Sequence, residues 1–165
     1  EGFPKTLIEN SPKGIKLKIS NGELKVKNTH VMANYIGSSD KFRDPKGFIA
    51  TGDQIELIND RYVFKGRISG VINVGGNKVY PEKIEQVLCR HQLVNLAYVF
   101  GKNSPITGQV VVANVMLSVT GFDHDTLRKE LLMFCTNYLE RHEIPVIIVF
   151  VSNFDTSLSG KLSRK

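Results

Sequence analysis

The first third of the chain contains short segments in which apolar residues alternate with polar ones. IKLKIS at 15–20 and ELKVKN at 23–28 alternate strictly with lysine, and GFIATGD and QIELIND follow at 47–60. Such alternation predicts strands with one face in water and the other in a core. Turn-forming pairs separate these segments, at Asn21-Gly22, Asp44-Pro45 and Asn59-Asp60. This part is predicted to be a small antiparallel β unit.

The rest of the chain has a different pattern, in which apolar runs typical of strands alternate with two segments whose apolar residues recur at helical spacing. The predicted order is β, α, β, β, α, β, formed by VINVGGNKVY, PEKIEQVLCRH, NLAYVFG, VVVANVMLS, DHDTLRKELLMFCTNYLE and IPVIIVFVS. Two helices that each bury a single stripe are expected to lie on one face of a small sheet.

The ends and buried faces of both helices follow from particular residues. Pro81 suits the first turn of the first helix because its missing N–H needs no partner there, and Asp123 suits the N-cap of the second. The predicted buried stripe of the first helix is Ile84, Val87 and Leu88. That of the second consists of Leu127, Leu131, Phe134, Cys135 and Tyr138, at spacings of three and four.

The predicted fold class is therefore α+β, with a small antiparallel β subdomain followed by a compact β-α-β-β-α-β lobe. The expected boundary lies in Lys65-Gly66-Arg67, so that residues 1–66 form the first part and residues 67–165 the second. At 165 residues and 41% hydrophobic content, the chain can bury such a core.

Charge and cysteine content exclude several classes of protein. Against 16 acidic residues stand 22 basic ones, and the excess in the second part equals the three charges of Lys161, Arg164 and Lys165. A cluster at one end favours a local anion over a nucleic-acid duplex. Cys89 and Cys135 are predicted to be buried thiols on apolar helix faces, because they show no CxxC spacing.

Neither a membrane span nor a metal site is expected. Apolar runs stay short of the roughly 18 residues that a span requires, and the first residues lack the pattern of a signal peptide, so a cytoplasmic location is expected. His30, His91, His124 and His142 show no ligand spacing, and SGK lacks the preceding glycine of a phosphate-binding loop of the Walker type.

Three stretches carry the recognisable chemistry: IATGD at 49–53, YVFKGRISGVINVGGNKVYPEKIE at 62–85 and SGKLSR at 159–164. In this order and spacing they resemble the C-terminal region of the AMP-forming adenylating enzymes. That superfamily includes acyl-CoA synthetases, peptide-synthetase adenylation domains and firefly luciferase. The resemblance runs from about Gly22 to Arg164, and the VGGNKVYP wording looks most like an acyl-CoA ligase.

The resemblance implies nucleotide-binding roles for Asp53 and Arg67. Asp53 would accept hydrogen bonds from the ribose hydroxyls of ATP, which suits a carboxylate because it offers no competing donor. Arg67, in the Gly-Arg pair that marks the start of a mobile C-terminal domain, would lie near the ribose and phosphate.

The resemblance implies that two glycine-containing segments serve a rotation of the small C-terminal domain between the two reaction steps. Ser69 stands where many members carry the Asp or Lys about which the small domain rotates, and Gly70 beside it allows a large backbone change. Gly75 and Gly76 resemble a loop that approaches the pantetheine of CoA, since residues without Cβ let a thiol come close. Gly75-Gly76-Asn77 also has the composition of a plain hairpin turn, and both interpretations stand together.

Lys161 is implied to be the catalytic residue, stabilising the carboxylate, the α-phosphate region and the bridging oxygen as acyl-AMP forms. A compact ammonium on a flexible stem can follow charge as it moves between these groups. The lead-in departs from the family pattern, because Asp155 replaces a usual Pro and Ser157 a common Thr.

The implied function is that of an ATP-dependent acid–thiol ligase that uses ATP, Mg²⁺ and CoA to make acyl-AMP and then acyl-CoA. The phosphate loop, adenine motif and acyl pocket of the family would precede this chain, which alone is expected to be inactive. Expected partners are an N-terminal adenylation domain, a carboxylic acid and a CoA or carrier-protein thiol. The alternatives are an adenylation domain that loads a carrier protein and an RNA-recognition-like module. The latter needs exposed aromatics on central strands, and VVVANVML has none.

Overall fold

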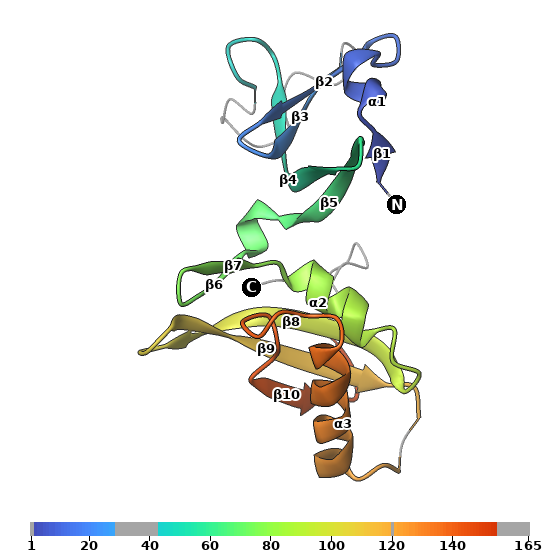
Figure 1. The fold of residues 1–165 in the computed structure, drawn as a ribbon, viewed down its shortest axis with the longest axis vertical. Coiled ribbons are helices and arrows are strands. Elements are labelled where there is room, and N and C mark those ends of the chain that lie inside the picture. Colours follow the sequence, from blue (N-terminus) through green and yellow to red (C-terminus); the bar gives the residue numbers. More distant parts are fainter. Residues whose placement is uncertain (1, 29–42, 120, 155–165) are drawn as a thin grey trace. The chain divides into compact units, whose positions relative to one another are not determined.

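The computed structural model describes residues 2–28, 43–119 and 121–154. The chain forms two compact units, residues 1–69 and residues 70–165, shown in Figure 1. A 3₁₀ turn, Ile68–Gly70, spans the boundary between them. The assignment of residues 1–66 and 67–165 to two domains of an adenylating enzyme stays a prediction.

Within residues 2–28 and 43–69, the first unit is an antiparallel sheet with strand order β1-β5-β4-β3-β2 and one short helix. Its elements are β1 (Phe3–Pro4), α1 (Thr6–Glu9), β2 (Ile15–Ser20), β3 (Glu23–Asn28), β4 (Ile49–Ile58) and β5 (Arg61–Arg67). The predicted turns join β2 to β3 and β4 to β5. Asn21, Gly22, Asn59 and Asp60 all have positive φ, which Asn, Asp and Gly tolerate best in tight hairpins. The two predicted segments at 47–60 form the single strand β4.

The alternating pattern of β2 and β3 gives this ribbon one lysine-rich face. Lys16 lies opposite Lys27, and Lys18 lies opposite Lys25. Like charges directly opposite each other are unfavourable, and the ring of Phe48 lies 5.8 Å from Lys18 Nζ and 6.0 Å from Lys27 Nζ. The aromatic ring thus offsets part of the repulsion on this face.

In its described residues, the second unit contains one mixed sheet and two helices. Its elements are β6 (Ile72–Val74), β7 (Asn77–Val79), α2 (Pro81–Leu88), β8 (Val94–Ser104), β9 (Gly108–Leu117), α3 (His124–Thr136) and β10 (Ile147–Phe150). The strand order is β10-β9-β6-β7, with β8 also paired to β9, and β10 runs parallel to β9. The predicted α+β class and element order are confirmed, except that VINVGGNKVY is a hairpin of two strands.

The starts of both helices agree with the sequence prediction. Helix α2 begins at Pro81, and Ile84, Val87 and Leu88 are buried. At the start of α3, the Asp123 carboxylate accepts a hydrogen bond of 2.9 Å from the Thr126 N–H. Hydrogen bonds from the Thr126 side chain and backbone hold the pKa of Asp123 below its usual value.

The buried stripe of α3 differs from the prediction at its C-terminal end. Leu127, Leu131 and Cys135 are buried, but Tyr138 is 51% exposed. The helix ends at Thr136, so residues beyond it leave the helical period and Leu139 packs into the core instead.

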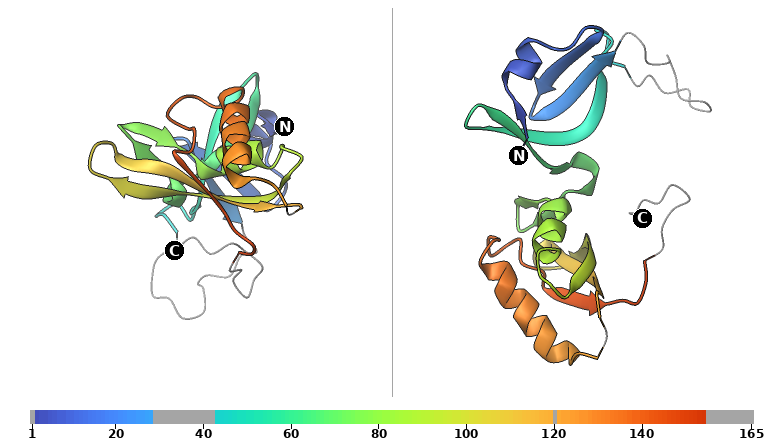
Figure 2. Two further views of the ribbon diagram at one scale, coloured as in Figure 1. Left: turned by 90° about the horizontal axis from the view of Figure 1, so that it is seen from below. Right: turned by 90° about the vertical axis from the view of Figure 1, so that its right-hand side faces the viewer.

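Both helices pack on one face of the sheet, as predicted. The core joins the stripes of α2 and α3 to alternate residues of three strands, Ala97, Val99, Val111, Ala113, Val115 and Ile148. Figure 2 shows this unit from two further sides. Within the part of the chain that the structure describes, the helices are too short or too polar to cross a membrane.

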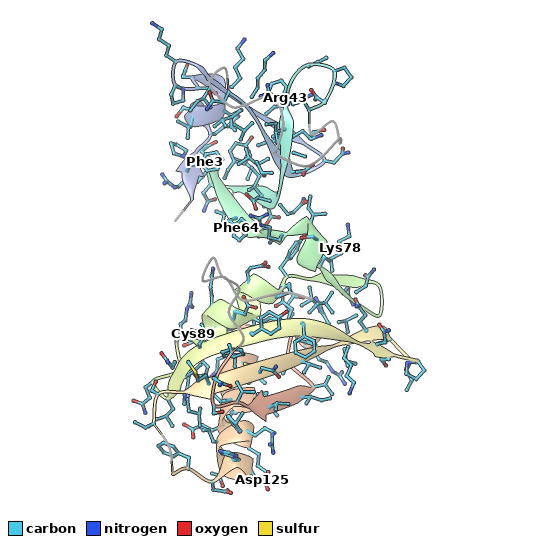
Figure 3. All side chains as sticks on the ribbon, turned by 180° about the vertical axis from the view of Figure 1, so that it is seen from behind. Phe3, Arg43, Phe64, Lys78, Cys89 and Asp125 are labelled. Atoms are coloured by element: carbon cyan, nitrogen blue, oxygen red, sulfur yellow. The ribbon has the colours of Figure 1, made fainter. Side chains whose placement is uncertain are left out.

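The prediction that both cysteines are buried is wrong for Cys89. Cys135 is buried, whereas Cys89 is exposed (Figure 3). Because α2 ends at Leu88, Cys89 is the C-cap residue and turns away from the apolar stripe. Burial raises the pKa of the Cys135 thiol to about 11, and partial burial of the sulfur also raises the pKa of Cys89.

Iodoacetamide is expected to modify Cys89 in the folded chain and to leave Cys135 unmodified. Only the thiolate reacts, so Cys89 should react more slowly than a free peptide thiol because of its raised pKa. Peptide mass spectrometry over time at mildly alkaline pH measures both rates. Denaturant should make Cys135 reactive, and equal labelling of both thiols in the folded chain would contradict the observed burial.

Candidate nucleotide-binding and hinge residues

Thr51, Gly52 and Asp53 lie within β4, where side chains hold the local backbone. The Thr51 hydroxyl donates to the carbonyl oxygen of Leu24 at 2.8 Å and accepts from the Asp53 N–H at 3.1 Å. The Gly52 N–H donates to Glu23 Oε1 at 3.1 Å. Gly52 has φ +75, a conformation that side chains with Cβ rarely adopt. These hydrogen bonds hold the backbone at Gly52 and Asp53, and so they fix the position from which the Asp53 side chain extends.

Asp53 and Arg67 lie opposite each other on β4 and β5 and form an ion pair. Arg67 Nε is 3.0 Å from Asp53 Oδ1, and Arg67 Nη1 donates to the carbonyl oxygen of Thr51 at 3.4 Å. A register shift between Gln54 and Ile55 produces this pairing, because a regular ladder from the Asn59-Asp60 turn would place Gly66 opposite Asp53. The structure thus brings together Asp53 and Arg67, which the sequence analysis identified from separate motifs.

The pair retains capacity for a ligand. The side chains are 28% exposed for Asp53 and 53% exposed for Arg67. Among the described residues, Asp53 Oδ2 has no hydrogen-bond donor, and a carboxylate has about four lone-pair sites for donors. A group with adjacent hydroxyls could donate to Asp53 while the remaining guanidinium N–H groups donate to a phosphate. The donor set therefore fits the ribose and phosphate of a nucleotide.

Gly75 and Gly76 form the tip of the β6–β7 hairpin. Their φ angles are 57° and 88°, and a Cβ at either position would meet no atom within 4 Å. The Gly75 N–H donates to the carbonyl oxygen of Thr107 at 2.9 Å. The hairpin interpretation is confirmed, and the surroundings of the tip are open. The approach of a thiol to this turn stays a prediction.

The remaining candidates differ in how far the structure describes them. Ser69 and Gly70 lie in the 3₁₀ turn, and the division into two units falls between them. Their role as a hinge stays a prediction. Lys161, Asp155 and Ser157 lie outside the described residues. The described parts of the chain hold no cluster of His, Cys, Asp or Glu that could bind a metal ion.

An aromatic cluster on the sheet was missed in the sequence analysis. The rings of Tyr98 and Phe100, both on β8, are stacked with centroids 5.6 Å apart, and the Phe154 ring lies edge-on to Tyr98 at 6.4 Å. The alternation in NLAYVFG could have revealed it, because Tyr98 and Phe100 are separated by the buried Val99.

Family membership follows from comparison with known proteins. Residues 83–161 match the AMP-binding enzyme C-terminal domain. The chain is 31% identical over 147 residues to 2-succinylbenzoate–CoA ligase of Bacillus cytotoxicus, covering 87% of this chain and 30% of that protein. It is 32% identical to acetyl-coenzyme A synthetase 2 of Candida albicans, covering 82% of this chain and 21% of that protein. The chain thus spans less than a third of the length of these curated relatives.

Solved structures show the same relationship. The fold is similar to o-succinylbenzoate CoA synthetase of Bacillus subtilis in complex with the acyl-adenylate intermediate, with a TM-score of 0.80 and 26% identity. That alignment covers 91% of this chain and 33% of the other. The same enzyme in complex with ATP and magnesium gives a TM-score of 0.76 and 25% identity.

The fold and the matched residues identify the C-terminal domain of an AMP-forming enzyme. The chain belongs to the AMP-forming adenylating enzymes, and it contains their C-terminal domain.

Proposed function

We propose that this chain is part of an AMP-forming acid–thiol ligase. The enzyme would join a carboxylic acid to ATP, giving acyl-AMP and pyrophosphate, and then transfer the acyl group to the thiol of CoA with release of AMP. The observation that carries the proposal is the Asp53–Arg67 pair at 3.0 Å, which places a carboxylate and a guanidinium close enough together to bind one ligand. Relatives with CoA-ligase names support it.

In the adenylation step, the chain's own residues would bind and orient the nucleotide. Asp53 would accept hydrogen bonds from the ribose hydroxyls, and Arg67 would donate to the ribose or the α-phosphate. Because the Arg67 Nε is held on Asp53, both groups would approach the nucleotide already oriented. Lys161 would stabilise the charge that develops between carboxylate and α-phosphate. Mg²⁺, when bound with ATP, supplies neutralisation of phosphate charge.

In the transfer step, the β6–β7 turn would allow a thiol to approach. Gly75 and Gly76 present bare backbone in open surroundings, which suits the narrow chain of pantetheine. CoA and the carrier-protein form of this thiol share the same pantetheine, so the turn fits both acceptors. The relatives named as CoA ligases favour CoA.

A carboxylate-activation assay tests the function. The complete enzyme that includes this chain should catalyse ATP–pyrophosphate exchange with some member of a panel of carboxylic acids. The chain alone should not, because the proposed acyl pocket and triphosphate site lie in the rest of the enzyme. Acyl transfer to CoA and to a pantetheinylated carrier protein, compared with the same acid, then identifies the acceptor. Absence of exchange across the whole panel would contradict the proposal.

Replacing Asp53 with asparagine should raise KM for ATP in the exchange assay by about tenfold to a hundredfold, the range expected for losing a hydrogen bond to a charged group. KM for the acid should change little, because the ribose lies away from the acyl group. Asp60→Asn is the matched control, since Asp60 lies in the turn between β4 and β5. An unchanged KM for ATP in the Asp53 variant would remove Asp53 from the nucleotide site.

A further inference from the structure

The chain after β10 is held to the second unit by two described contacts. The Val151 N–H donates to the carbonyl oxygen of Val115 at 2.9 Å, which continues the pairing of β10 with β9 by one bond. Phe154, the last described residue, is half-buried with its ring against Tyr98. Residues 151–154 therefore follow the sheet after the strand itself has ended.

Phe154 contacts the face of the sheet that the helices leave open. The core cluster takes Ala97 and Val99 from β8, so the alternating Tyr98 and Phe100 lie on the opposite face. Tyr98 pairs across the strand with Asn114, and Phe100 pairs with Val112. Both neighbours are uncharged. The stacked rings of Tyr98 and Phe100 form an aromatic platform, and the Phe154 ring packs against Tyr98 at an interplanar angle of 68°.

We propose that Phe154, seated on the Tyr98–Phe100 platform, is a positioning residue for Lys161. This inference rests on the proposed function, in which Lys161 acts during adenylation. Lys161 follows Phe154 by seven positions, and an extended chain covers at most about 3.6 Å per residue, so the anchor limits the reach of the lysine to roughly 25 Å. Without this contact, the last described contact before Lys161 would be the hydrogen bond of Val151, ten positions before the lysine.

The physical effect is a change in how often the lysine occupies its productive position. When the last contact lies farther from the lysine along the chain, the effective concentration of the lysine at its target is lower, and residues 152–154 would have to be ordered in each turnover. An edge-to-face aromatic contact is worth enough to change such a local equilibrium by about threefold to tenfold. The rate of thioester formation would stay the same, because this step does not use Lys161 in the proposed mechanism.

The first test compares both half-reactions in the complete enzyme with Phe154→Ala, Phe154→Tyr and Phe122→Ala. Phe122 is a matched control because it is an exposed phenylalanine before α3. We expect Phe154→Ala to lower kcat for acyl-AMP formation by about threefold to tenfold, with KM for ATP unchanged, the range of one aromatic contact. Acyl transfer from supplied acyl-AMP should stay at the wild-type rate. Phe154→Tyr should restore adenylation, and Phe122→Ala should match wild type.

Two outcomes would overturn the inference. Equal losses in both half-reactions would indicate a general structural defect, and wild-type adenylation in Phe154→Ala would show that the ring does not position the lysine. A Tyr98→Leu variant should lose a similar factor, and the Tyr98→Leu/Phe154→Ala double variant should lose no more than either alone. Additive losses would separate the two rings and contradict the platform.

A second measurement, on the 165-residue chain itself, separates failure of the anchor from failure of the proposed function. Amide hydrogen exchange at Val151 should accelerate by about threefold to tenfold in Phe154→Ala, since the aromatic contact no longer holds this segment. Phe122→Ala should leave it unchanged. If the wild-type enzyme activates no acid, both the proposed function and the role of Phe154 in it are disproved. If the Phe154→Ala chain exchanges the Val151 amide at the wild-type rate, Phe154 does not hold this segment and the anchor itself is disproved.

Discussion

Replacing Lys161 with alanine in the complete enzyme is expected to lower the rate of acyl-AMP formation by about a hundredfold to a thousandfold, the effect of removing one charge-stabilising group. The ammonium would interact with charge that moves from the carboxylate and α-phosphate to the leaving pyrophosphate. An alanine leaves this charge to water or to other groups. Because the second half-reaction starts from acyl-AMP already made, acyl transfer to CoA should stay within a few fold of wild type.

Single-turnover kinetics measure the two steps separately, from ATP and acid and from supplied acyl-AMP. Lys165→Ala is the matched control, since it removes a lysine from the same terminal segment. Lys161→Arg should recover little, because a planar guanidinium does not replace a compact ammonium at one point. Equal losses in both half-reactions, or a Lys165 effect of the same size, would mean that Lys161 acts through general charge rather than in adenylation.

Replacing Ser69 with proline is expected to lower acyl transfer by about tenfold or more while adenylation falls modestly, because proline fixes φ near −65° at the proposed pivot. The residue before a proline also avoids helical geometry, and Ile68 lies in the 3₁₀ turn Ile68–Gly70. If two poses of the C-terminal domain serve the two steps, a pivot restricted at Ser69 would hinder passage between them.

The measurement again pairs single-turnover formation of acyl-AMP with single-turnover transfer to CoA. Ser69→Ala is the matched control, because it removes the hydroxyl and keeps backbone freedom. If the alanine variant alone reproduces the loss, the hydroxyl and not the backbone matters. Wild-type transfer by the proline variant would place the pivot elsewhere in the chain.

Local chemistry in the sequence was sufficient to predict most elements of the fold. Asn21-Gly22 and Asn59-Asp60 predicted hairpins because few other residues accept positive φ at successive positions. Pro81 and Asp123 predicted two helix starts, since each satisfies or avoids an unpaired backbone group. The buried stripe of α2 followed from its period. These features depend on residues within a few positions of one another.

Contacts across strands and beyond element ends could not be predicted from the pattern alone. Cys89 looked like part of a buried stripe, but α2 ends one residue before it. The pairing of Asp53 with Arg67 depends on a register shift of one position, which the pattern of β4 and β5 does not reveal. The contact of Phe154 with Tyr98 joins residues 56 positions apart.

The sequence by itself determined the class of fold, the turns, the helix starts and the motifs that name the candidate residues. The tertiary structure alone decided that Asp53 and Arg67 share one ion pair, that the Gly75-Gly76 turn is open, and that Phe154 meets an aromatic platform. The physical reason is that conformational preferences act over a few neighbouring residues. Register and packing are set by the summed burial and hydrogen bonding of segments far apart in the chain.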